Sequence, residues 1–315
     1  MNDSGYYSEC MTVVVPVYNR AHLITRCLDS IYAQSYRPLR VVVVDNASTD
    51  STASAVEKWS ASHVSEGFTL CLLTENRQGA AYARQRGLDS VDTEKVMFFD
   101  SDDAMRPHCV AAVMQEWRHC PQAEIVAWPV TIHHAGGPVE THSIKGNLLE
   151  RHMVHAVLRT QGHAVKTDLL RACGGWKGEY PVWDDFETGV RLLLGNPKVL
   201  PVVGSLADVY PQEESITGTD FSSKAGKWEN TLDGIESLLR ASGRRDTGRL
   251  VGIVNYRRAI LAADYAKEGR HDLAGPLYCR ALSESTRRQR PLIRFAYHWT
   301  RLGMRGAFSI IGKFL

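Results

Sequence analysis

The sequence predicts an α/β fold with a doubly wound, mostly parallel sheet and a C-terminal helical appendage. β-branched apolar runs alternate with stretches of helical periodicity through residues 11–130, which is typical of parallel strands joined by helices. From about residue 222 onward, helical periodicity continues without strand-like runs. At 315 residues the chain is longer than a usual single domain, which agrees with one large domain plus an appendage or with two domains.

The first strand is expected at residues 11–18, MTVVVPVY, because a continuous, β-branched and mostly apolar run suits a strand covered on both faces. A helix should follow, because the next apolar side chains share one helical face: Leu23, Cys27, Leu28 and Ile31. The same strand–helix unit repeats from residue 39, from residue 68 and from residue 95. A fifth strand is expected at residues 123–130, AEIVAWPV.

Three of these strands end in polar side chains, which are Asn19, then Asp45 and Asn46, then Asp100, Ser101 and Asp102. The carboxyl ends of parallel strands meet at one edge of a doubly wound sheet, where ligands bind. The first turn, PVYNRA, contains no glycine, which excludes a Rossmann dinucleotide site, and the chain has no P-loop motif. Asp100 and Asp102 therefore predict a divalent cation that neutralises a phosphorylated ligand. A solvated acidic turn is the alternative interpretation.

Five segments, in the same order, resemble the family-2 glycosyltransferases of GT-A fold, which use nucleotide-diphospho-sugar donors. The segments are VVVPVYNRAHLITRCLDSIYAQSY, VVVVDNASTDST, ENRQGAAYARQRGL, FFDSDD and GGWKGEYPVWDDFETGVRLL. A D-x-D motif alone is common by chance, so the specificity comes from the ordered set. The resemblance implies a catalytic domain at residues 1–221. Helical periodicity and charge beyond it predict a helical appendage at 222–285 and a basic amphipathic segment at 286–315.

The resemblance also implies a role for each matching residue. The donor-binding residues would be Pro16, Val17, Tyr18, Asp45, Asn46, Arg84, Asp100 and Ser101. Among them, Tyr18 would stack on the nucleobase, and Asp45 and Asn46 would approach the base and the ribose. Asp102, together with Asp100, would hold a divalent cation, either Mn²⁺ or Mg²⁺.

The segment VWDDFE offers three candidates for a general base, Asp184, Asp185 and Glu187. The resemblance assigns this role to Asp185, and repulsion from the neighbouring Asp184 would raise its proton affinity. One base opposite a departing group gives direct displacement with inversion, whereas retention would need a closely placed nucleophilic carboxylate. The alternative is that these acids only begin a helix, where they favour the positive end of its dipole.

Two positions depart from the family pattern. The turn after the second strand usually has two acids, but the second is Asn46 here, which leaves a uracil preference open. The segment YPQEESIT resembles the closing loop, in which many members have a histidine; Gln212 and Glu213 stand there and receive no role.

The alternative interpretation of Arg84 is a solvated residue on the surface of a helix. Asp103 is expected to cap the segment after the D-x-D motif.

Residues 286–315 contain seven basic residues and no acid. Helical spacing places five basic residues on one face, namely Arg287, Arg290, Arg294, Arg301 and Arg305. It places four apolar residues on another face, namely Leu292, Phe295, Trp299 and Leu302. This pattern is typical of a helix lying in an anionic membrane interface. Packing on the same protein or an oligomer contact are the alternatives. Residues 262–282 resemble one tetratricopeptide-type hairpin, and one copy is too short for a repeat array.

Together these features predict a metal-dependent, inverting glycosyltransferase that transfers a sugar to a hydroxyl of a saccharide or lipid-linked acceptor. The expected setting is bacterial surface-polysaccharide or glycolipid synthesis in the cytoplasm, at the inner face of the membrane. A non-catalytic nucleotide-sugar-binding subunit and a haloacid-dehalogenase-type phosphatase are the alternatives.

Seven scattered cysteines without CxxC predict reduced thiols and no zinc site. Neither a leader, a bilayer-spanning run nor a nucleic-acid partner is expected, and the sugar, the nucleobase and the oligomeric state are left open.

Overall fold

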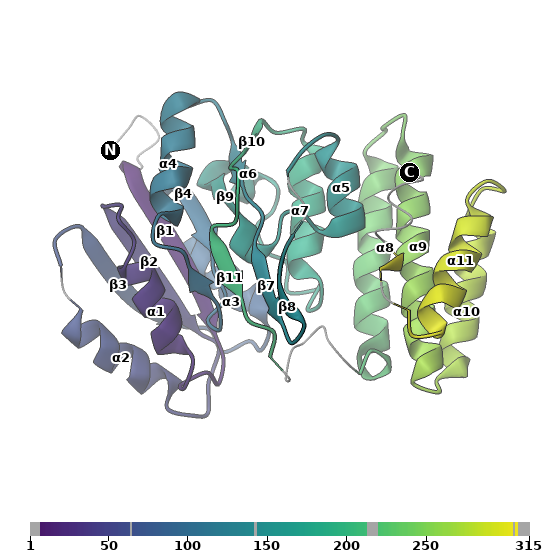
Figure 1. Cartoon of the computed structure of the whole chain (residues 1–315), viewed down its shortest axis with the longest axis horizontal. Coiled ribbons are helices and arrows are strands. Elements are labelled where there is room, and N and C mark those ends of the chain that lie inside the picture. The colour runs from purple at the N-terminus through teal and green to yellow at the C-terminus, as the bar shows by residue number, and fades with distance from the viewer. Residues whose placement is uncertain (1–6, 64, 142–143, 213–219, 305, 308–315) are drawn as a thin grey trace. The chain divides into compact units, whose positions relative to one another are not determined.

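The computed structural model describes residues 7–63, 65–141, 144–212, 220–304 and 306–307 (Figure 1). They fall into two units, a sheet unit and a helical unit. The sheet unit comprises Met1–Lys145, Val157–Pro181 and Gly195–Gln212. The helical unit comprises Gly146–Ala156, Val182–Leu194 and Glu213–Leu315. The helical unit thus takes two whole segments, and the beginning of its third, from residues 1–221, the range expected for the catalytic domain.

The sheet unit is built on a seven-stranded sheet with the strand order β10-β6-β9-β4-β1-β2-β3. These strands are β1 (Tyr7–Val17), β2 (Leu39–Asp45), β3 (Phe68–Thr74), β4 (Thr93–Phe98), β6 (Ile125–Ala127), β9 (His163–Lys166) and β10 (Val199–Pro201). β9 runs antiparallel to both of its neighbours, and every other pairing is parallel. The predicted doubly wound, mostly parallel sheet is confirmed.

The direction of strand succession reverses at β1. β2 and β3 lie on one side of β1, whereas β4 lies on the other. Val17 pairs with Asp45, and Asp45 pairs with Thr74, so the strands end together at one edge, which we call the rim. Doubly wound sheets bind their ligands at such a reversal, beyond the carboxyl ends of the strands.

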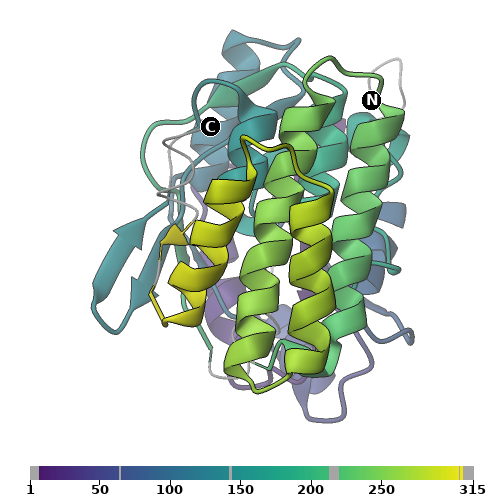
Figure 2. The same cartoon turned by 90° about the vertical axis from the view of Figure 1, so that its right-hand side faces the viewer.

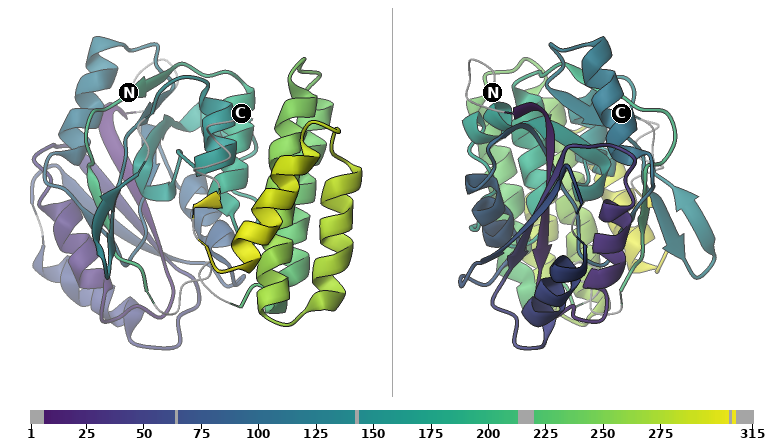
Figure 3. Two further views of the ribbon diagram at one scale, coloured as in Figure 1. Left: turned by 45° about the vertical axis from the view of Figure 1, so that its right-hand side comes forward. Right: turned by 90° about the vertical axis from the view of Figure 1, so that its left-hand side faces the viewer.

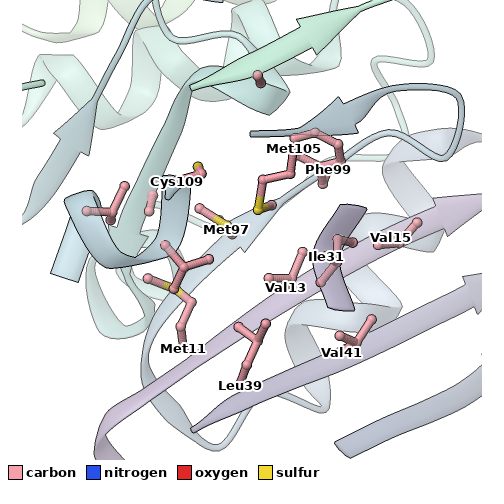
Figure 4. Close-up of a cluster of buried hydrophobic side chains, with 14 of the residues drawn as sticks. Met11, Val13, Val15, Ile31, Leu39, Val41, Met97, Phe99, Met105 and Cys109 are labelled. Atoms are coloured by element: carbon pink, nitrogen blue, oxygen red, sulfur yellow. The ribbon is translucent and has the colours of Figure 1, made fainter. Parts of the chain in front are cut away.

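One face of the sheet is covered by α1 (Ile24–Tyr32), α2 (Thr52–Ser62) and α4 (Cys109–His119). Side chains alternate between the faces of a strand, so every second residue of β1 points to this side. Met11 and Val13 meet Ile31 of α1 and Cys109 of α4 in this core, and all four are fully buried (Figure 4).

The opposite face is covered by α3 (Ala80–Asp89), while α6 (Thr167–Ala172) packs on β4 and β9. α3 approaches the sheet closely because Gly87 has no side chain. A Cβ at this position would lie 2.3 Å from Cγ1 of Val14 and 3.3 Å from Cγ2 of Val44. Real side chains do not tolerate the shorter distance, so Gly87 fixes the depth of α3 and of Arg84, which lies one turn earlier.

A second, four-stranded sheet has the order β5-β11-β7-β8. Its strands are β5 (Ala104–Met105), β7 (Thr131–His134), β8 (Gly137–Glu140) and β11 (Ala207–Val209). The Arg106 guanidinium joins three of them, because it donates to the Asp208 carboxylate at 2.9 and 3.1 Å and to Thr131 Oγ1 at 3.0 Å. The β7–β8 hairpin projects from the sheet unit (Figure 3). The sequence does not predict this sheet, because strands of two to four residues show no recognisable alternation.

The helical unit contains six helices within the described ranges. They are α5 (Leu148–His155), α7 (Asp184–Leu194), α8 (Ala225–Ala241), α9 (Thr247–Lys267), α10 (His271–Ser283) and α11 (Arg290–Arg301). α9 is central: most of its residues are buried, and it packs against α5, α8, α10 and α11 (Figure 2). α9 and α10 form the predicted helical hairpin, and the turn between them includes Gly269 at φ 77°.

A network of ion pairs lies inside the helical unit. Arg258 of α9 has a side chain only 1% exposed, and it contacts Asp233 at 2.6 Å, Glu236 at 2.6 Å and Glu284 at 3.1 Å. Arg280 contacts Asp233 and Glu284 at 2.9 Å each. The network therefore ties α8, α9 and α10 together through paired charges.

α11 packs on the helical unit through a face that the sequence analysis did not identify, formed by Ile293, Ala296, Tyr297 and Thr300. The expected apolar row stays partly accessible: Leu292, Phe295 and Trp299 are half-buried, and Leu302 is 74% exposed. Arg305 and Lys313 lie outside the described residues. Over the part of the chain that the structure describes, no helix combines the length and the hydropathy needed to span a bilayer.

Candidate active site

The turns after β1 and β2 are joined at the rim by side-chain hydrogen bonds. Asn19 adopts φ 49°, and its backbone N–H donates to Ser48 Oγ at 2.9 Å. Pro16 and Val17 are buried at the end of β1, whereas the adjacent Tyr18 is 44% exposed. An accessible ring fits the expected stacking role of Tyr18, which stays a prediction.

Asp45 and Asn46 are both buried at the end of β2, but they face different partners. The side-chain amide of Asn46 donates to the carbonyl oxygens of Glu75 and Arg77 and accepts the N–H of Gly79. These three partners belong to residues 75–79, which we call the β3–α3 loop. The side-chain amide of Asn46 therefore forms its hydrogen bonds with the β3–α3 loop.

Arg84, on α3, is only 5% exposed. Its Nη2 donates to Oδ1 of Asp100 at 2.7 Å, and its guanidinium lies over the indole ring of Trp176, 4.9 Å from the ring centroid. The alternative interpretation of Arg84 as a solvated helix residue is therefore wrong. The ion pair places a cation at the first acid of the D-x-D motif, where α3 meets the end of β4.

The three acids after β4 have different environments. Asp103 is 2% exposed, whereas Asp100 and Asp102 are half-buried. Burial, together with the charges of Asp100 and Asp102, raises the pKa of Asp103 to about 8. Burial and the charge of Asp100 also raise the pKa of Asp102. Raised carboxyl pKa values show that the folded protein disfavours the negative charge concentrated here, so a cation would be stabilised.

Gln161 bridges two of these acids and was not identified from the sequence. It lies in the 3₁₀ turn Thr160–Gly162, and its Nε2 donates to Asp100 at 2.6 Å and to Asp103. Asp103 also accepts the backbone N–H of Tyr210 at 2.9 Å. The expectation that Asp103 caps the following segment is therefore wrong, because it links the motif to the end of β11. Gln161 is 61 residues from Asp100 in the chain, so no local pattern could indicate it.

Arg26 of α1 contacts both the D-x-D motif and Tyr210, the first residue of the expected closing loop. Arg26 donates to the backbone carbonyl of Asp102, and its guanidinium lies 4.3 Å from the centroid of the Tyr210 ring. The side chain of Gln212 donates to the carbonyl of Tyr210 at 2.9 Å. Glu213, the next residue of that loop, lies outside the described residues.

The expected base, Asp185, and its neighbour Asp184 belong to the helical unit, where they begin α7. Both are half-buried, and Oδ1 of Asp185 accepts the N–H of the next residue at 2.7 Å. Trp183 precedes them at φ 53°, an uncommon conformation for a bulky residue. The third candidate, Glu187, is fully buried and forms two 2.7 Å hydrogen bonds with Arg191, which makes it a structural residue.

The residues at the rim fit a hard divalent cation. Asp102 offers a half-buried carboxylate whose raised pKa reflects uncompensated charge, and Mg²⁺ and Mn²⁺ prefer such oxygen ligands. Among the described residues, no group of three His, Cys, Asp or Glu side chains is arranged to hold a metal. A site of one or two carboxylates is typical where ligand phosphates provide the remaining oxygens.

A family model described as Glycosyl transferase family 2 matches residues 12–163. A Campylobacter jejuni protein named GalNAc(5)-diNAcBac-PP-undecaprenol beta-1,3-glucosyltransferase is 30% identical over 107 residues, which are 34% of this chain and 34% of that protein. The chain thus spans about a third of the length of that curated relative.

Two solved structures share the fold. A crystal structure of S. aureus TarS, residues 1–349, has a TM-score of 0.68 and 19% identity, and the match covers 97% of this chain and 92% of that one. Other TarS crystals contain UDP or UDP-GlcNAc. The mannosyltransferase PcManGT from Pyrobaculum calidifontis, in complex with GDP-Man and Mn²⁺, has a TM-score of 0.56 and 22% identity, with 94% of this chain and 88% of that one covered.

The family match includes the ends of β1, β2 and β4 and therefore most of the rim. The TarS similarity, which covers 97% of this chain, confirms the predicted GT-A-type fold with additional C-terminal helices. The phosphatase alternative loses its basis, because its D-x-D would follow the first strand, whereas Asp100 follows β4. Over residues 12–163 the chain therefore matches glycosyl transferase family 2.

Proposed function

We propose that this protein is a metal-dependent, inverting glycosyltransferase with a nucleotide-diphospho-sugar donor and a saccharide or lipid-linked acceptor. The observation that carries the proposal is the arrangement at the rim. There the Arg84–Asp100 ion pair lies beside Asp102 and Asp103, and burial and mutual repulsion raise the pKa of both of these carboxyls, so a bound cation would favour their ionised forms. The nucleotide-sugar complexes of TarS and of the mannosyltransferase, and the glucosyltransferase name of the C. jejuni relative, support the class of donor.

The donor would lie across the ends of β4, β1 and β2. Tyr18 would stack on the nucleobase, and Asp45 would meet its edge. Asp100, oriented by Arg84 and Gln161, would face the ribose. Ser101 is small and buried between the two acids, which leaves room for the diphosphate.

Asp102, with Asp100, would hold Mn²⁺ or Mg²⁺. Such a cation supplies Lewis-acid stabilisation of the charge on the departing diphosphate. The protein's own contribution is to fix two oxygen ligands at the rim and to place the Arg84 guanidinium beside them, which favours an anionic ligand.

Asp185 would accept the proton of the acceptor hydroxyl. The hydroxyl oxygen forms a bond to the anomeric carbon while the bond from that carbon to the diphosphate oxygen breaks. The electron pair leaves with the nucleoside diphosphate, and the proton goes to the carboxylate. A single displacement of this kind inverts the anomeric configuration.

The test is a thermal-shift panel of UDP-, dTDP- and GDP-sugars, each with and without Mn²⁺. We expect one nucleotide to raise the Tm, and to do so only with the cation. The D102N variant should lose this dependence on Mn²⁺. If no nucleotide sugar raises the Tm of the wild type, the proposed donor class is wrong.

The role of Asp185 is tested by D185N, with D168N as the matched control. Both aspartates lie in the first turn of a helix, α7 and α6 respectively. Loss of a general base typically costs about 10²–10⁴-fold in rate. D185N should show such a loss in kcat with donor binding retained, and D168N should not. Equal turnover by D185N and wild type would refute the assignment.

We propose, in addition, that residues 286–315 bring the enzyme to the cytoplasmic face of an anionic membrane, where lipid-linked acceptors of surface polysaccharides lie. The support is α11, where the exposed Arg294 and Arg301 adjoin the half-buried Phe295 and Trp299. Co-sedimentation with vesicles containing phosphatidylglycerol should weaken severalfold in R294Q/R301Q. R270Q, an exposed arginine change in the same unit, should bind as the wild type does. Equal binding to neutral and anionic vesicles would contradict the proposal.

A further inference from the structure

Asn46 uses its whole amide group to hold the β3–α3 loop. Its Nδ2 donates to the carbonyl oxygens of Glu75 at 2.9 Å and Arg77 at 2.7 Å, and its Oδ1 accepts the N–H of Gly79 at 2.8 Å. The backbone carbonyl of Asn46 also accepts Nε2 of Gln78 at 3.0 Å. The residue is 4% exposed. Since a primary amide has two N–H donors, none is left for a ligand.

The set of partners distinguishes asparagine from aspartate at this position. Two of the partners are carbonyl oxygens, which require donors, and the third is an N–H group, which requires an acceptor. An aspartate would keep the bond to Gly79 but would set a negative charge against the carbonyl oxygens of Glu75 and Arg77. The loop of this chain therefore requires the amide at the position where the family pattern has a second acid.

The loop in turn sets the start of α3. Gly79 has φ 138°, a conformation that L side chains rarely adopt, and its carbonyl accepts the N–H groups of Tyr82 at 3.0 Å and Ala83 at 3.2 Å. Arg84 follows directly and reaches Asp100. A shift of the loop would therefore displace the guanidinium from the acid that it pairs with.

We infer that Asn46 is a positioning residue, which holds the β3–α3 loop and through α3 keeps Arg84 at Asp100, and that its side chain does not read the nucleobase. The choice between uracil and other bases is then left to the neighbouring Asp45. The effect on catalysis rests on the proposed function, whereas the hold on the loop is a property of the fold alone.

The structural half of the inference is tested by hydrogen exchange measured by mass spectrometry. N46D should increase exchange in residues 75–88 while exchange in the helical unit stays unchanged. N46S, which removes the amide without adding charge, should act in the same direction and more weakly. N147D is the matched control, because among the described residues the side chain of Asn147 only accepts a hydrogen bond, from the N–H of Glu150, and a carboxylate can do the same. Unchanged exchange in residues 75–88 of N46D would overturn the inference.

The functional half is tested by kinetics with two donors that differ in the nucleobase. Loss of buried hydrogen bonds of this kind predicts that N46D raises the KM roughly tenfold for both donors, with their ratio unchanged. In a double-mutant cycle with R84K, the effects on KM should be less than additive, since both changes disturb the same ion pair. A change in the donor ratio by N46D, or strict additivity with R84K, would refute the role. If the wild type turns over no nucleotide sugar, the proposed function fails, and the exchange result still decides whether Asn46 holds the loop.

Discussion

Two groups of three carboxylates in this protein have opposite electrostatics. The rim triad consists of Asp100, Asp102 and Asp103, and the helical triad consists of Asp233, Glu236 and Glu284. Among the described residues, one arginine, Arg84, forms an ion pair with the rim triad, whereas Arg240, Arg258 and Arg280 all pair with the helical triad.

The pKa values of the two groups differ accordingly. Burial opposes ionisation in the helical triad, but hydrogen bonds to the arginines outweigh it and lower the pKa of Asp233 and of Glu236. At the rim, burial and mutual repulsion raise the pKa of Asp102 and Asp103. Paired charges therefore hold helices together, whereas unpaired charges at a strand end mark the place that a cation would occupy.

The largest expected effect is the loss of the arginine at the centre of the helical triad. R258M would leave three carboxylates around a buried position, and removing one partner of such a network costs about 3–5 kcal/mol of unfolding free energy. Urea denaturation measures this loss, and R118M, at an exposed arginine, serves as the control. A loss no greater than that of the control would show that the two triads do not differ as described.

At the rim, a substitution should instead raise the unfolding free energy, by a smaller amount. D102N removes a charge that the fold disfavours, so without metal it should raise the unfolding free energy by about 1 kcal/mol. The same variant should lower kcat/KM roughly 100-fold, since a ligand of the cation is lost. Urea denaturation in EDTA and steady-state kinetics with Mn²⁺ check the two parts. A destabilised D102N in EDTA would mean that the rim charge is already compensated.

Adding a fourth carboxylate to the rim should make the stability of the fold depend more strongly on a divalent cation. Q161E replaces an amide donor to Asp100 and Asp103, so it should destabilise the metal-free protein by about 1–2 kcal/mol. Mn²⁺ should restore part of this loss and give a larger Tm shift than in the wild type. In Q34E, whose buried amide donates to carbonyl oxygens away from the triad, Mn²⁺ should restore nothing. Equal responses of both variants to Mn²⁺ would contradict the interpretation.

The smallest effect concerns Glu75, a rim acid that is paired as the helical acids are. Hydrogen bonds from Arg77 lower the pKa of Glu75 to about 2. A lowered carboxyl pKa stabilises the fold above the unfolded value near 4.5, and this contribution is lost as the pH falls from there toward 2. With the arginine exposed to solvent, E75Q should cost only about 0.5 kcal/mol at pH 7. The difference from the wild type should vanish near pH 2, and a difference independent of pH would contradict the assignment.

The sequence was sufficient for five of the seven strands of the large sheet, because their signal is local, whereas the short strands β9 and β10 were not predicted. The run at residues 11–18 is continuous and mostly apolar, and β1 is indeed buried on both faces. The acids after β4 follow such a strand directly, so their place at the rim could be predicted. The small sheet could not, since its strands are too short to show a period.

The parts of the site that were missed depend on contacts between distant segments. Gln161 and Tyr210 reach Asp103 from positions 58 and 107 residues away, and a single sequence carries no sign of such pairings. For the same reason the sequence analysis expects Asp103 to cap the following segment, which is wrong. Asn46 was recognised as a departure from the family pattern, but its reason, two carbonyl oxygens in the β3–α3 loop, became apparent only from the geometry.

The helical unit also constrains the order in which the protein matures. α5 and α7 are synthesised well before α8 and α9, yet they complete their packing with these later helices. Thr231 of α8 donates to the carbonyl of Val182, and Arg257 of α9 donates to the carbonyl of Met153. On the ribosome, the helix that begins with Asp184 and Asp185 must therefore wait for some 60 more residues before its partners emerge. The strand ends that form the rim are synthesised within the first hundred or so residues, whereas the helix that carries the expected base completes its packing only after α8 and α9 have been made.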